Sequence, residues 1–68
     1  MTVYEFTKLS VADVMFQIVN ADKTGFMSNP EIMIEADKNV VRELYGNRIV
    51  VYFEIVSKKR MMLYTKEA

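Results

Sequence analysis

The chain has 68 residues and contains neither histidine nor cysteine. It therefore has no imidazole base, no thiolate nucleophile, no disulfide and no zinc site of ordinary composition. Nine basic residues balance nine acidic ones, and 51% of the residues are hydrophobic, which is too apolar for a disordered chain. We expect a folded protein that is not an enzyme and that binds no cofactor and no metal.

The length predicts one small domain over residues 1–68. A domain of this size buries only about 60% of its unfolded surface. Small domains commonly depend on a disulfide, a metal or a partner subunit for stability, and a disulfide is impossible here. We therefore expect a homo-oligomer, most simply a homodimer. No leader-like segment and no apolar run of about 18 residues is present, so we expect a cytoplasmic protein with no membrane partner.

The first twenty residues predict a strand and then a helix. Residues 2–9 are rich in β-branched and aromatic side chains, which favours a strand. Ser10 and Asp13 are typical of a helix start, and the apolar residues of 11–20 recur at helical spacing. The alternative for 11–20 is a strand, because apolar residues also alternate there, at Val14, Phe16 and Ile18.

The middle of the chain predicts a longer helix. The segment Ser-Asn-Pro-Glu at 28–31 contains capping residues and a proline suited to a first helical turn. The helix is predicted to run from 30 to 45 and to end at Gly46 in a left-handed conformation. Its predicted apolar stripe consists of Met33, Ala36, Val40, Val41, Leu44 and Tyr45.

The last third predicts a β-hairpin. Residues 48–56 and 60–66 are two β-rich segments joined by a short turn. The predicted fold is a small α+β domain of order β-α-α-β-β, with a short antiparallel sheet and the helix packed on one face. If residues 11–20 form a strand, the order becomes β-β-α-β-β. In the first hairpin strand, the residues predicted to face the helix are Ile49, Val51, Phe53 and Ile55.

The other face of the hairpin is the most unusual feature of the sequence. A sheet covered on one side should be polar on the other, but here that face is largely apolar. Full burial of such a side chain stabilises a protein by about 1.5–3 kcal/mol, so leaving several of them in water loses that stabilisation. We interpret the face as an interface with a second copy or another protein. The alternative is that helices or long basic side chains cover it. The predicted interface residues are Val50, Tyr52, Val56, Met62 and Tyr64.

The same hairpin is also rich in basic residues. A basic tip beside an aromatic residue could contact phosphates or stack on bases. This makes a nucleic-acid-binding regulator the alternative function. A charged turn that keeps a sheet edge soluble explains the same residues without a ligand. The residues of the alternative site are Arg48, Lys58, Lys59 and Arg60.

Residues 20–31 resemble the calcium-binding loop of the EF-hand family in their spacing. The resemblance covers 12 of the 68 residues, and it implies calcium ligands at alternate positions and a carboxylate at the last one. The first position is an asparagine where the family favours aspartate. A turn followed by a helix cap accounts for the same residues, so we expect calcium not to be a partner. The matching residues are Asn20, Asp22, Thr24, Gly25, Phe26, Met27, Ser28 and Glu31.

Taken together, these features predict a small non-catalytic interaction or regulatory protein. It would act by protein–protein binding through the apolar face of its sheet. Short inhibitors and adaptors encoded by phages and other mobile elements are proteins of this kind, and we expect a role of that type.

Overall fold

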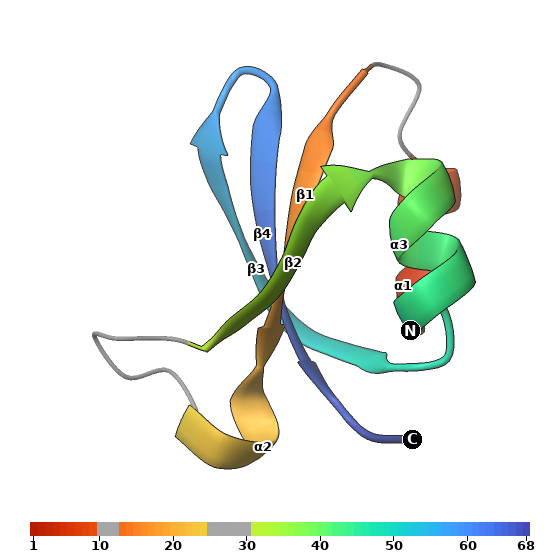
Figure 1. The fold of residues 1–68 in the computed structure, drawn as a ribbon, viewed down its shortest axis with the longest axis vertical. Helices are drawn as coiled ribbons and strands as arrows, with labels where there is room; N and C mark the ends of the chain where they lie inside the picture. The colour runs from red at the N-terminus through yellow and green to blue at the C-terminus, as the bar shows by residue number, and fades with distance from the viewer. Residues whose placement is uncertain (10–12, 25–30) are drawn as a thin grey trace.

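The computed structural model describes residues 1–9, 13–24 and 31–68. Figure 1 shows a sheet in which the strands lie in the order β2-β1-β4-β3. The elements in chain order are α1 (Val3–Lys8), β1 (Met15–Asn20), α2 (Ala21–Thr24), β2 (Ile32–Asp37), α3 (Lys38–Tyr45), β3 (Ile49–Ser57) and β4 (Arg60–Lys66). The α+β class is confirmed, but the order of elements differs from both predicted orders.

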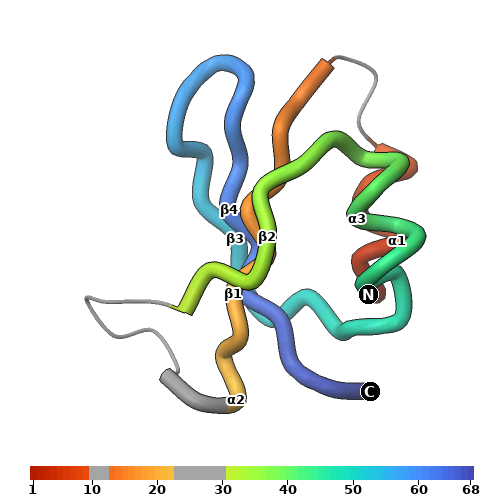
Figure 2. Tube along the Cα trace, viewed as in Figure 1, coloured from red at the N-terminus to blue at the C-terminus, as the bar shows by residue number. Residues whose placement is uncertain are grey.

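The sheet is mixed rather than antiparallel. β1 pairs antiparallel with β2, and β4 pairs antiparallel with β3. The two central strands, β1 and β4, run parallel. Figure 2 traces how the last strand of the chain returns to lie beside the first. The predicted antiparallel sheet is therefore wrong at its centre.

The strand predicted for residues 2–9 is wrong, because this segment forms helix α1. The Thr2 hydroxyl accepts a hydrogen bond from the Glu5 backbone N–H at 3.1 Å. The Glu5 carboxylate accepts one from the Thr2 backbone N–H at 2.9 Å. This reciprocal capping box is a strong helix start, and its Thr-x-x-Glu signature is visible in the sequence. It outweighs the weak β preference of the residues that follow.

The helix predicted for residues 11–20 is also wrong, and the alternative strand is correct. Residues 10–12 lie outside the described residues, and β1 begins at Met15. Because β1 has a neighbour on each side, its side chains are covered more fully than in an edge strand. Phe16, Ile18 and Val19 are fully buried.

The segment predicted as one helix over 30–45 is divided into a strand and a shorter helix. β2 takes residues 32–37, and Ile34 of β2 lies opposite Ile18 of β1. Pairing with β1 satisfies the backbone groups on one side of this segment, and those on the other side face the edge of the sheet. The Asp37 carboxylate caps α3 by accepting hydrogen bonds from two backbone N–H groups, at 2.9 and 3.0 Å. The cap predicted at 28–30 lies outside the described residues.

The two main helices lie on one face of the sheet, which we call the helix side (Figure 1). The opposite face is called the far side. The prediction of a helix packed on one face is therefore confirmed for α3, and α1, which was predicted as a strand, packs beside it. A hydrogen bond of 2.7 Å from Arg42 Nε to the buried Thr7 hydroxyl joins the two helices. The core between helices and sheet consists of Val3, Phe16, Ile18, Val41 and Leu63.

The inward stripe of α3 is narrower than predicted. Val41 is fully buried and Tyr45 packs against the core, but the side chains of Val40 and Leu44 are 37% and 59% exposed. Residues four apart share one face of a helix, so Val41 and Tyr45 face the core, whereas Val40 and Leu44 lie on an adjacent face. Val40 and Leu44 were therefore wrongly assigned to the core.

We predict that Val41→Asp unfolds the protein, because it buries an unpaired charge. Leu44→Asp, in the same helix, should change the free energy of unfolding by less than about 1 kcal/mol. Urea unfolding followed by circular dichroism measures both variants. Equal loss of stability in the two would contradict the assigned orientation of α3.

The glycine after α3 is required by space and not by a left-handed backbone. Gly46 has φ −56°, so the predicted left-handed ending is wrong. A Cβ atom at this position would lie 2.4 Å from the backbone oxygen of Arg42. The turn from α3 into β3 is therefore tight enough to exclude a side chain.

We predict that Gly46→Ala lowers the free energy of unfolding by about 1–3 kcal/mol through this clash. Urea unfolding checks the value, with Asn47→Ala as the control because Asn47 is exposed in the same turn. An alanine variant as stable as the parent would show that the turn relaxes without strain.

Candidate functional site: the outer hairpin surface

β3 is an edge strand, and most of its length is exposed. The predicted hairpin is confirmed, with a turn at Lys58 and Lys59. On the outer side of β3, the described residues place the N-terminal segment only beside the start of the strand. Thr2 forms a bridge with Ile49, and the Val50 N–H donates to the Met1 oxygen at 2.8 Å. Every residue from 51 to 57 is exposed.

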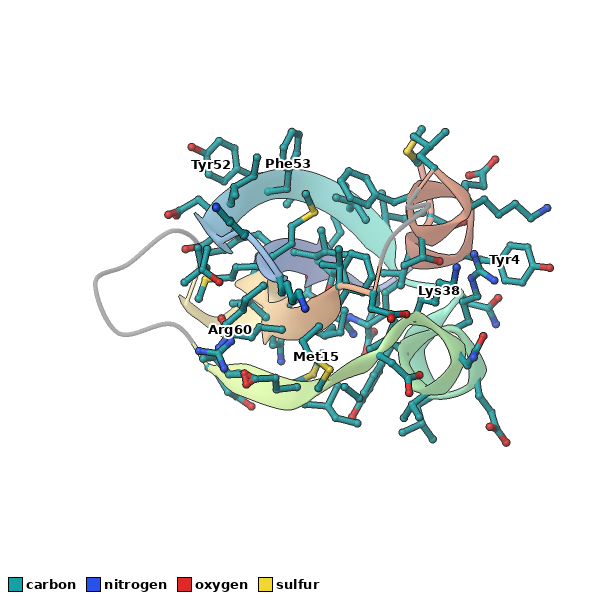
Figure 3. All side chains as sticks on the ribbon, turned by 90° about the horizontal axis from the view of Figure 1, so that it is seen from above. Tyr4, Met15, Lys38, Tyr52, Phe53 and Arg60 are labelled. Atoms are coloured by element: carbon teal, nitrogen blue, oxygen red, sulfur yellow. The ribbon has the colours of Figure 1, made fainter. Side chains whose placement is uncertain are left out.

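We name the exposed apolar part of this strand the outer hairpin surface. Figure 3 shows Tyr52 and Phe53 at the margin of the sheet, on the strand farthest from β2. The surface spans both sides of the sheet, because successive side chains of a strand alternate. Its members are Val51, Tyr52, Phe53, Ile55 and Val56.

A register irregularity in β3 separates Val50 from the other predicted interface residues. Val50 lies opposite Thr65, whereas Tyr52 lies opposite Tyr64, so one extra residue stands between the two pairs. An extra residue reverses the alternation of side chains along a strand. Val50 consequently packs against the core instead of lying on the far side with Tyr52.

The other predicted interface residues differ in exposure. Tyr52 and Val56 are exposed, Met62 is half-buried, and Tyr64 is buried. The structure thus places two of the five in the outer hairpin surface. Whether they contact a partner stays a prediction.

On the far side, two tyrosines and a glutamate form a small polar cluster. The Tyr64 hydroxyl donates to the Glu54 carboxylate at 2.9 Å, and the rings of Tyr52 and Tyr64 have centroids 5.5 Å apart. Burial raises the pKa of the Tyr64 hydroxyl above its ordinary value of 10.0. The hydrogen bond to Glu54 and the negative charge of that carboxylate raise this pKa further. The cluster holds the one charge of β3 in a fixed position.

The raised pKa of Tyr64 predicts a loss of stability at high pH. In the unfolded chain this phenol ionises near 10.0, but in the folded chain it stays neutral to higher pH. Its contribution is therefore complete below 10.0 and is lost as the pH rises through the folded pKa. The difference between the phenolate absorbance titrations of the parent and Tyr64→Phe should have its midpoint above 10.0.

Glu54→Gln is the companion variant for this titration. It should lower the midpoint without returning it to 10.0, because burial is the larger cause. A Tyr64 midpoint at or below 10.0 in the parent would contradict the burial of this hydroxyl.

On the helix side, an apolar cavity of about 520 Å³ opens beside β3. The Phe6 and Phe53 rings stand at its wall with centroids 5.3 Å apart. Next along β3, Ile55 is 70% exposed, and Phe53 is 47% exposed. The residues lining the cavity are Met1, Phe6, Leu9, Val14, Phe16, Phe53 and Met61.

Sequence reasoning missed this part of the surface because it assigned Phe53 and Ile55 to the core. Their alternation with Tyr52 and Glu54 correctly indicates the helix side. It does not indicate how far the helices extend along β3. A signal in the sequence was the capping box at Thr2 and Glu5, which marks a helix start where a strand was predicted.

The basic residues of the alternative nucleic-acid site are not brought together. Lys58 and Lys59 are exposed at the hairpin tip, and Arg60 pairs with Glu35 at 3.1 Å. Arg48 precedes the other end of β3, and its side chain is largely buried. Two lysines and one paired arginine thus remain at the tip.

Arg48 instead joins the strands at the base of the hairpin. Its Nε donates to the buried Thr65 hydroxyl at 2.8 Å, and Nη2 donates to Asn20 and Asp22 at 3.3 and 3.1 Å. Thr65 in turn donates to the Val19 oxygen at 2.8 Å. Asn20 and Asp22 are two of the residues that resemble calcium ligands, and both here bind a guanidinium.

The rest of the calcium-like loop is only partly described. Residues 25–30 lie outside the described residues, and the position of the Thr24 side chain is also undescribed. Among the described residues, no three histidine, cysteine or acidic side chains gather to form a metal-binding group.

Comparison with known proteins finds no match to this chain among protein families, curated proteins or solved structures. Among the described helices, none combines the length and the apolar character needed to cross a membrane.

Proposed function

We propose that this is a non-catalytic interaction protein that binds a polypeptide through its outer hairpin surface. The observation that carries the proposal is the exposure of five large apolar side chains on one edge strand. Burying such a surface is favourable by about 25 cal/mol for each Å² removed from water. Such a surface suits a small inhibitor or adaptor that binds a target protein. It also suits a regulator that acts as an oligomer.

The composition of β3 supports polypeptide binding in particular. Exposed edge strands are usually protected by lysine, proline or several charges. β3 contains neither lysine nor proline, and Glu54 is its one charged residue. The Glu54 carboxylate accepts a hydrogen bond from the Tyr64 hydroxyl, and this bond holds the Glu54 side chain beside the strand. The edge is therefore open to the main chain of a partner as well as to its apolar side chains.

Nucleic-acid binding has less support from the geometry. The largely buried Arg48 belongs to the base of the hairpin, and Arg60 is paired with a carboxylate. Phosphate binding draws its affinity from several basic groups acting together. The two lysines that remain exposed at the tip form a small basic area.

Photocrosslinking in cells of the natural source tests the proposed function. A benzoylphenylalanine introduced at Ile55 should crosslink to a polypeptide, because this side chain is exposed at the centre of the proposed contact. The same group introduced at Glu43, exposed on α3, is the matched control. Mass spectrometry of the adducts identifies the chain that is bound. Equal or absent adducts at the two positions would refute binding through this surface.

A further inference from the structure

We infer that the polypeptide bound at the outer hairpin surface is a second copy of this chain. The two β3 strands would pair antiparallel about a two-fold axis at Phe53 and join two sheets into one. This inference rests on the proposed function, because it names the occupant of the same surface. Four features of the structure support it: the two edges of the sheet, the length of the open edge, the position of the charge, and the helix-side cavity.

The two edges of the sheet differ in their protection. β2, at one edge, carries Glu35 and Asp37 within six residues. β3, at the other edge, carries Glu54 within nine. Charges on an edge strand oppose the addition of another strand. Pairing is therefore favoured at β3 and opposed at β2. A contact between two copies of the same edge closes on itself as a dimer and leaves no β3 edge to extend it.

The open length of β3 determines the register of such a pairing. Its start is occupied on the outer side by Met1 and Thr2, which contact Ile49 and Val50. Its end has the second register irregularity, between Ile55 and Ser57, and Val51 is itself the extra residue of the first. Between these limits lies the segment 51–55, whose midpoint is Phe53.

An antiparallel pairing of this segment with its own copy uses all of the open edge. Phe53 then lies opposite Phe53 of the second copy, and Val51 lies opposite Ile55. Residues that face each other in antiparallel strands lie on the same face of the sheet. Phe53 therefore meets its own copy on the helix side.

The charge in β3 excludes the neighbouring register. A two-fold axis at Glu54 would place two carboxylates directly opposite each other, which is destabilising. With the axis at Phe53, each Glu54 lies opposite Tyr52 instead. The tip of one hairpin, with exposed Lys58, then extends toward the start of α1 in the other copy. Glu5 is exposed there beside the N-terminal amino group, so the lysines meet one charge of each sign.

The helix side gives the pairing its apolar contact. Phe53 forms part of the wall of the 520 Å³ cavity in each copy, so the two cavities lie next to each other across the axis. Ile55 of one copy comes beside Val51 of the other and toward Met1, both of which are exposed in the single chain. Stable interfaces bury about 800 Å² on each partner. Strand pairing alone buries little side-chain surface, and this combined contact adds the apolar part.

Disulfide crosslinking tests the register directly, because the chain contains no cysteine. Residues opposite each other in antiparallel strands have Cα atoms about 4.5–5.5 Å apart, which matches disulfide geometry. Phe53→Cys should form a covalent dimer under mild oxidation. Leu44→Cys, exposed on α3, is the control and should stay monomeric under the same conditions.

A mixing experiment keeps the test informative if Phe53→Cys weakens the fold. Val51→Cys and Ile55→Cys should each crosslink poorly alone but efficiently when the two proteins are mixed. This result is expected only if 51 of one copy lies opposite 55 of the other. Crosslinking of either variant alone that is as efficient as in the mixture would overturn the register centred on Phe53.

Light scattering tests the dimer without crosslinking. The parent at tens of micromolar should have twice the 7.9 kDa mass of the chain. Ile55→Lys should raise the dissociation constant at least tenfold, because it places two lysines in the contact. Val51→Glu combined with Ile55→Lys should recover the affinity, because each new lysine then faces a new glutamate.

The outcomes separate this inference from the proposed function. A parent that is monomeric at this concentration overturns the second copy as occupant. A photocrosslink from Ile55 to a different polypeptide would then leave the proposed function standing. A dimer that is unchanged by Ile55→Lys and gives no crosslink at Phe53→Cys overturns this interface. Absence of both the dimer and any photocrosslink at Ile55 refutes the proposed function as well.

Discussion

The helices of this protein are too short to cover the helix side of its sheet. α1 has six residues and α3 has eight, so they are about 9 and 12 Å long at 1.5 Å per residue. β3 has nine residues and extends for about 30 Å at 3.3 Å per residue. The helices cover β1, β2 and the start of β3 (Figure 1). The apolar side chains of β3 therefore continue beyond the core, and Phe53 and Ile55 become surface residues.

The contacts at the base of the hairpin fix how this surface is presented. Arg48 connects β1, α2 and β4 through hydrogen bonds to side chains and to the Thr65 backbone oxygen. The Asp22 carboxylate that it binds also accepts the backbone N–H of Glu67. Arg48 is a basic residue with a structural role, and its charge is already compensated. The two ends of the hairpin thus differ: one is tied to three elements, and the other projects with its apolar residues exposed.

The sequence predicts the hairpin well because its signals are local and agree with one another. The β-rich segments 48–56 and 60–66 and a short charged turn are sufficient, and no distant contact is needed. The segments 2–9 and 32–37 were predicted wrongly for different reasons. In 2–9 the strand was predicted from β propensity alone, and the capping box of Thr2 and Glu5, although present in the sequence, was not considered. In 32–37 the strand depends on pairing with β1, a contact between segments that no local pattern contains.

The candidate site could be predicted only in part, because its exposure depends on features that no local sequence pattern contains. Tyr52 and Val56 follow from the alternation of apolar residues, but the exclusion of Val50 depends on an extra residue in the strand that the sequence does not mark. Phe53 and Ile55 depend on the lengths of two helices, one of which was predicted as a strand.

A residue that faces the helix side is not thereby a core residue. The core ends where the helices end, and the pattern of the strand continues past that point. In our proposal these extra apolar residues are covered by a partner. β3 would then be largely apolar along its whole length, with its first part stabilising the fold and its later part binding the partner. This division explains why the most apolar strand of the chain lies at the edge of the sheet and not at its centre.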